Sequence, residues 1–70
     1  MDEREKEIMN DIINILKKEK NGLTIGEITR KMMKKRKITR QTLAKYLFAL
    51  ELSGKLTKRE IGRAKLFRLA

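Results

Sequence analysis

The sequence contains no cysteine, no histidine and only one serine among its 70 residues. Without cysteine there are no disulfide bonds, and without cysteine and histidine the usual zinc sites are excluded. Nucleophilic catalysis lacks both a Cys nucleophile and a His base, and the single serine, Ser53, stands where a helix is expected to end. We therefore expect neither an enzyme nor a bound metal or cofactor.

Long apolar runs are also absent, since no stretch approaches the roughly 20 residues that a transmembrane helix needs. The start, Met1-Asp2-Glu3, is acidic where a signal peptide would be basic. We expect no membrane partner and a cytoplasmic location. A chain of this length forms one small domain, residues 1–70, which buries only about 60% of its unfolded surface. A consistent helical core, self-association or both must stabilise it.

Acidic residues are scarce outside the first 16 positions. Residues 1–16 hold five acids and two bases, a net charge of −3, whereas residues 17–70 hold seventeen bases and four acids, a net charge of +13. Such a cationic body predicts binding to a polyanion, chiefly nucleic acid. The alternative is a solvated, lysine-rich surface of a thermophilic protein, and abundant Lys and Ile without Val favour a thermophilic, archaeal source.

Three helices are expected from apolar periodicity and capping residues. Asp2, with Glu5 as its reciprocal partner, is expected to cap a helix over residues 3–20. Thr24-Ile25-Gly26-Glu27 is a second capping box and predicts a helix over residues 25–35. Thr39 is the expected cap of a third helix over residues 40–53.

A β hairpin is expected after the third helix, which Gly54 ends. The hairpin spans residues 55–69 and turns near Gly62. A very short strand at Leu23-Thr24 is expected to pair with it. These elements predict a mostly helical α+β domain without repeats or interdomain linkers.

The third helix has a polar outer face. Leu43, Leu47 and Leu50 point inward, which leaves Arg40 and Gln41 exposed near the amino end. Arg can pair with guanine and Gln with adenine through two hydrogen bonds each. The alternative is an ordinary exposed helix face with a good cap.

Two further basic segments are candidates for contacts with nucleic acid. Arg59, Arg63 and Lys65 surround the Gly62 turn, where they could reach phosphates or a minor groove; alternatively, they protect a sheet edge from aggregation. The run 34–37 is a candidate for gripping phosphates, although cations are also favourable at a helix carboxyl end by themselves.

The first and third helices carry more apolar residues than the side of each helix that faces the core needs. We expect a homodimer interface formed by Met9, Ile13, Phe48 and Leu52. Packing of Phe48 and Leu52 under the first helix, or scattered exposure, are the alternatives.

Several segments of the chain together resemble those of a known protein family. The resemblance to winged helix-turn-helix transcription regulators, of the archaeal, MarR-like or ArsR-like type, rests on Leu23-Thr24-Ile25-Gly26-Glu27-Ile28, Ile38-Thr39-Arg40-Gln41-Thr42-Leu43, Tyr46-Leu47, Leu50-Glu51, Gly54 and Gly62-Arg63-Ala64-Lys65-Leu66-Phe67-Arg68-Leu69. It implies three helices followed by a two-stranded β wing. One departure is the turn before the third helix, which lacks the usual Gly and is about one helical turn longer.

The resemblance implies that Arg40, Gln41, Thr42 and Lys45 contact the major groove and that Arg63 and Lys65 act from the wing. Tyr46 would contact a phosphate or close the core. The whole DNA-binding surface expected from the sequence comprises Lys35, Arg36, Lys37, Thr39, Arg40, Gln41, Thr42, Lys45, Tyr46, Arg59, Arg63 and Lys65.

We therefore expect a protein that binds double-stranded DNA with sequence preference and regulates transcription as a homodimer. A protein-interaction or assembly module is the alternative from another class. An architectural or RNA-binding protein with little sequence preference is the third, because fold alone does not decide function.

Overall fold

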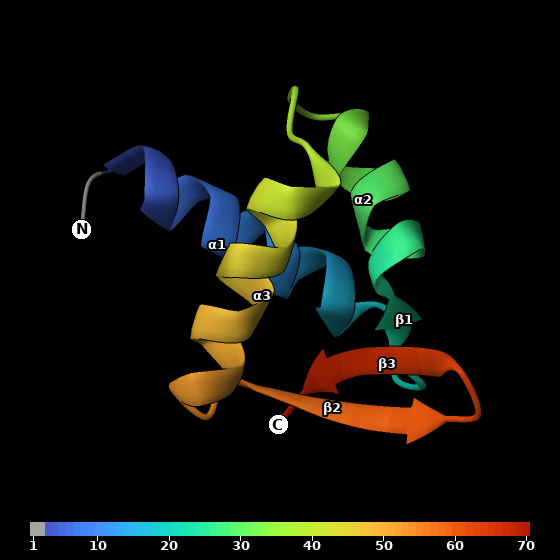
Figure 1. Ribbon diagram of the computed structural model, residues 1–70. Helices are drawn as coiled ribbons and strands as arrows, with labels where there is room; N and C mark the ends of the chain where they lie inside the picture. The colour runs from blue at the N-terminus through green and yellow to red at the C-terminus, as the bar shows by residue number, and fades with distance from the viewer. Residues whose placement is uncertain (1–2) are drawn as a thin grey trace.

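The computed structural model describes residues 3–70, which form three helices and three strands (Figure 1). Asp2, the cap expected for the first helix, lies outside the described residues. The domain is a mostly helical α+β fold. Along the chain, its elements are α1 (Glu3–Lys17), β1 (Leu23–Thr24), α2 (Ile25–Met33), α3 (Arg40–Leu52), β2 (Leu56–Ile61) and β3 (Ala64–Leu69).

Two helices begin at the threonines expected to cap them. The Thr24 backbone amide donates to Glu27 Oε1 over 3.0 Å, and the Glu27 amide donates to Thr24 Oγ1 over 3.3 Å, which completes the capping box of α2. At the start of α3, the Thr42 amide donates to Thr39 Oγ1 over 3.1 Å. These caps confirm the predicted starts because the necessary donors and acceptors lie within one turn of each other.

The carboxyl ends of α1 and α2 differ from the expected boundaries. α1 ends at Lys17 rather than at residue 20, because the amides of Lys18 and Glu19 bond three residues back and tighten the last turn. Gly22 then adopts a φ of +88°, which turns the chain into β1. α2 ends at Met33 rather than at residue 35, and the chain then becomes non-helical before the Thr39 cap.

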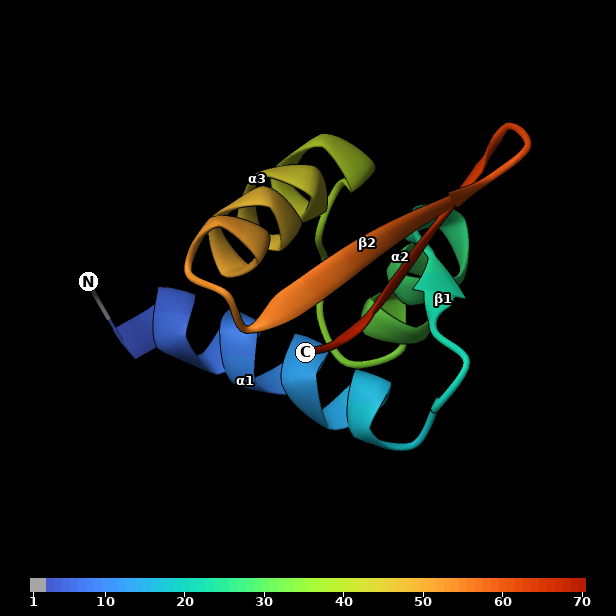
Figure 2. The same cartoon turned by 90° about the horizontal axis from the view of Figure 1, so that it is seen from below.

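The three strands form one antiparallel sheet in the order β1-β3-β2. Leu23 pairs with Phe67, which confirms the short strand expected at Leu23-Thr24. The β2–β3 hairpin turns at Gly62, whose φ is +62°, and Ile61 pairs with Ala64 across the turn. Seen from below, the far half of the hairpin projects beyond the helices (Figure 2).

The core lies between the three helices and the near half of the sheet. Met9, Ile13 and Tyr46 pack against it from its margin. Its buried members are Ile8, Ile12, Ile15, Leu16, Leu23, Ile28, Met32, Ile38, Leu43, Leu47, Leu50, Leu56 and Phe67. Since Leu43, Leu47 and Leu50 all point into this core, they fix the rotation of α3 and so determine which of its residues face outward.

Within the described part of the chain, no helix combines the length and the apolar character needed to cross a membrane.

Candidate nucleic-acid interface

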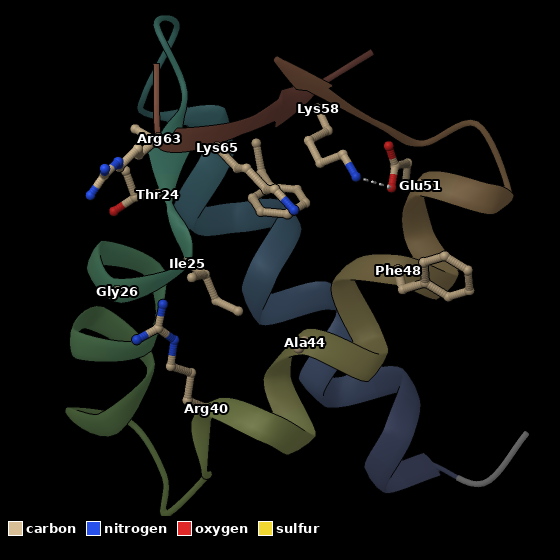
Figure 3. A pocket seen from close by; sticks show the side chains of 12 residues that line it. Thr24, Ile25, Gly26, Arg40, Ala44, Phe48, Glu51, Lys58, Arg63 and Lys65 are labelled. Atoms are coloured by element: carbon tan, nitrogen blue, oxygen red, sulfur yellow. Dashed lines mark ion pairs between the residues drawn. The ribbon is translucent and has the colours of Figure 1, made fainter. Parts of the chain in front are cut away.

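A cleft of about 680 Å³ separates α3 from the β2–β3 hairpin, and the start of α2 closes one end of it (Figure 3). It brings together three segments that are far apart in the sequence. Its lining residues are Thr24, Ile25, Gly26, Arg40, Ala44, Phe48, Glu51, Lys58, Arg63, Ala64, Lys65 and Phe67.

One stripe of α3 forms the helical side of the cleft. Arg40, Ala44, Phe48 and Glu51 follow one another at spacings of four, four and three residues, so they lie along a single side of the helix (Figure 3). Arg40 stands at the amino end, beside the start of α2. The Phe48 side chain is 60% exposed although it is aromatic.

The strand register determines which hairpin side chains reach the cleft. Lys58 pairs with Phe67 across the two strands, so both side chains lie on the same face of the hairpin. Lys65 is two residues from Phe67 and shares that face. Arg59 pairs with Leu66 and lies on the opposite face. The structure thus brings Lys65 and Arg63 to the cleft but separates Arg59 from them.

The cleft is strongly cationic. Arg40, Lys58, Arg63 and Lys65 line it with a single carboxylate, that of Glu51, which gives a net charge of +3. The Lys58 ammonium lies 3.9 Å from that carboxylate and forms an ion pair between β2 and α3 (Figure 3). Three cations therefore have no ion-pair partner among the residues that line the cleft.

Other expected contacts on α3 lie on different sides of it. Gln41 and Lys45 are exposed on the outer face, close in sequence to Arg40. Thr42 and the half-buried Tyr46 line a separate hollow toward the start of α1. Thr39 donates its hydroxyl hydrogen to Thr42 Oγ1 over 3.0 Å, so its side chain is engaged in the cap.

The basic segment before α3 does not act as one unit. Arg36 donates to Asp11 Oδ2 over 2.7 Å, and both side chains are partly buried. Lys35 lies instead in a hollow beside the end of α1, and Lys37 lies in the hollow that contains Tyr46. The structure therefore provides an intramolecular partner for Arg36, keeps Lys37 in the same hollow as Arg36 and separates Lys35 from both.

The four residues expected at a dimer interface do not all lie on one surface. Met9 and Ile13 pack against the core and flank Leu50. Phe48 faces the cleft on the other side of α3, because residues 48 and 50 are about 200° apart around the helix. Leu52 is 72% exposed at the end of α3.

Glu51, Lys58 and Phe67 are among the residues that line the cleft without having been expected from the sequence as site residues. The available signal was strand alternation, because Lys65 and Phe67 are two residues apart in β3. The turn at Gly62 then fixes Lys58 opposite Phe67.

Hydrogen bonds from the Thr24 amide, and then from its hydroxyl, hold the pKa of the Glu27 carboxylate below its ordinary value of 4.5, and the charges of Arg30 and Lys31 act in the same direction.

Residues 3–70 contain no group of three or more acidic side chains arranged to hold a metal ion. Comparisons of the chain with protein-family models, curated proteins and solved structures found no match.

Proposed function

We propose that this chain is a winged helix-turn-helix protein that binds double-stranded DNA and regulates transcription, with α3 as its recognition helix and the β2–β3 hairpin as its wing. One observation carries the proposal. Cations from α3 and from the hairpin, which are distant in sequence, converge on the same cleft. Two cationic elements on either side of a cleft can contact the phosphates of one DNA strand that runs between them.

The dimensions of the elements support this arrangement. α3 has 13 residues and is about 20 Å long, and a major groove about 12 Å wide admits one helix. With α3 in that groove, the protruding hairpin would lie over the neighbouring minor groove (Figure 2). The phosphate strand between the two grooves would then run past Arg40, Arg63 and Lys65 at the cleft.

Exposed apolar side chains favour a second candidate function, an assembly module. Phe48 lies in the cleft, and Ile61 is exposed in the projecting half of the hairpin. In that function the same two elements would contact a protein, and binding would depend less steeply on salt than binding to DNA.

Titration of duplex DNA at several salt concentrations tests the proposal. We expect binding at 50 mM salt, with a slope of log K against log salt near −3 per protomer, since about three unpaired cations would neutralise phosphates. Arg63→Gln should reduce that slope by about 1. Lys17→Gln removes the same charge from an exposed position of α1 outside the cleft and should change the slope less. Absence of binding at 50 mM would refute the proposal.

Selection of preferred duplexes from a random pool distinguishes the proposed regulator from an architectural protein. Enrichment of a defined sequence supports a regulator, whereas uniform retention of all sequences indicates backbone binding alone.

We also propose a homodimer, with its contact moved to the acidic start of α1. Met9 and Ile13 already pack against the core, so spare apolar positions on α1 no longer support this contact. Charge favours the start of α1 instead, because Glu3 and Glu7 are exposed and reduce the positive charge where two cationic protomers would approach.

A further inference from the structure

The cleft contains an apolar surface that a duplex would leave unused. Ile25, Ala44, Phe48 and Phe67 line it together with the cations. Phosphates would engage Arg40, Arg63 and Lys65, whereas an aromatic ring is best covered by the flat face of a base. The 60% exposure of Phe48 is therefore unexplained by binding to the backbone of an intact duplex.

An aromatic ring beside several cations is the combination used to bind single-stranded nucleic acid. The base stacks on the ring, and the cations hold the adjoining phosphates. Here Arg40 and Phe48 lie eight residues apart on the stripe of α3 that lines the cleft. Figure 3 shows Arg40 directed toward the start of α2, Phe48 at the other end of the stripe, and Lys65 on the hairpin side of the cleft. A volume of about 680 Å³ is within the range of pockets that hold drug-sized ligands, a class that includes single nucleotides.

We propose that this cleft binds a short unpaired segment beside a duplex, with one base stacked on Phe48 and the phosphates of its neighbouring nucleotides held by Arg40, Arg63 and Lys65. This inference rests on the proposed DNA binding and extends it to junctions between single and double strands. An intact duplex supplies no such base, because its bases are paired and stacked and taking one out of the stack is unfavourable. A frayed end or a short overhang supplies it without that cost.

The test compares one duplex with blunt ends and the same duplex with an overhang of three unpaired nucleotides, the first of them 2-aminopurine. We expect wild-type protein to bind the overhang duplex about tenfold more tightly than the blunt one. Stacking on Phe48 should also quench the 2-aminopurine fluorescence.

Variants on α3 assign the effect to one side chain. Phe48→Ala should remove the preference for the overhang and the quenching, while its affinity for the blunt duplex changes little. Phe48→Tyr should retain both. Leu52→Ala is the matched control, because Leu52 is an exposed apolar residue one turn later that is not among the lining residues of the cleft. Circular dichroism checks that each variant folds.

Three other outcomes would overturn this inference, and one of them would also overturn the proposed duplex binding. Equal affinity of the wild type for both duplexes would overturn the inference and leave the proposed duplex binding intact, whereas no binding to either at 50 mM salt would overturn both. A labelled acidic peptide with a central leucine provides the protein-binding arm. Binding of that peptide that depends on Phe48, without a preference for the overhang, would assign the cleft to a protein partner instead.

Discussion

The guanidinium of Arg36 donates a hydrogen bond to the carboxylate of Asp11 over 2.7 Å, which ties the middle of α1 to the segment between α2 and α3. The exposed fractions are 27% for the Arg36 side chain and 22% for that of Asp11, so the pair is screened less than a surface ion pair. Because Thr39 caps α3 only three residues after Arg36, this contact helps to fix where α3 begins.

We expect this pair to stabilise the fold. Arg36→Gln and Asp11→Asn should each lower the free energy of unfolding by about 1 kcal/mol, with a coupling energy of about 0.5–1.5 kcal/mol in a double-mutant cycle. Urea denaturation of the four proteins measures it. Lys35→Gln is the control, since Lys35 is exposed and should change stability by less than about 0.5 kcal/mol. A coupling energy of zero would show that the contact does not contribute.

Replacing glycines by alanine should have effects of opposite sign. Gly26 lies in α2 without a positive φ, and an added Cβ would meet only Thr24 Oγ1 at 3.9 Å, so Gly26→Ala should stabilise by about 0.5–1 kcal/mol. At Gly22, φ is +88° and a Cβ would lie 2.8 Å from the Phe67 carbonyl oxygen. Gly22→Ala should therefore destabilise by more than about 1 kcal/mol.

Gly54→Ala separates two causes of that destabilisation, which are the backbone strain at a positive φ and the close approach of the added Cβ to Phe67. Gly54 also has a positive φ, +82°, but an added Cβ would meet nothing within 4 Å. Thermal unfolding should rank the proteins Gly26→Ala, wild type, Gly54→Ala and Gly22→Ala from most to least stable. An equal loss for the last two would show that the close approach to Phe67 adds nothing to the backbone strain.

Glu27 should make stability depend on pH in the acidic range. Its pKa is lowered in the folded state, so its contribution is fully present above pH 4.5 and is lost as the pH falls through the folded pKa. Glu27→Gln keeps a side chain suited to the capping box but cannot titrate. Melting temperatures from pH 7 to pH 3 should thus fall less for this variant than for wild type, and parallel curves would contradict the assignment.

The starts of α2 and α3 could be predicted from the sequence because a cap is local. Thr24 and Glu27 are three residues apart, and any chain that begins a helix there brings them together. The Asp11–Arg36 contact spans 25 positions, and each residue was assigned to a separate charged segment. Only the packing of α1 against the other helices brings the two side chains together.

The hairpin illustrates a different limit on what can be predicted from the sequence. Its turn and its positive charge could be predicted, but the face on which each cation lies depends on the register. With Lys58 opposite Phe67, Lys58 reaches the cleft and Arg59 does not. The roles of Met9 and Ile13 were also inaccessible, since helical periodicity shows an apolar face but not the width of the core that covers it.

A homodimer that uses the acidic start of α1 should respond to charge reversal. We expect the wild type to form dimers at tens of micromolar and the double variant Glu3→Lys/Glu7→Lys to be monomeric, because it would place cations where two positive protomers meet. Sedimentation equilibrium measures both. Ile13→Glu is unsuitable, since Ile13 packs against the core and its replacement would disturb folding. A monomeric wild type in this range rules the homodimer out.

Sequence preference should depend on the outer face of α3 rather than on the hairpin. Gln41→Ala should cost about 1–3 kcal/mol on the preferred duplex and little on others, because an exposed Gln on the outer face can make a two-bond contact to a base. Arg40→Ala and Arg63→Ala should weaken binding to all duplexes alike, because both residues line the cleft and a contact to phosphate carries no base information. Competition binding with single-base variants of the preferred duplex measures both effects. Altered base preference in Arg63→Ala, with that of Gln41→Ala unchanged, would move the reading of sequence from α3 to the hairpin.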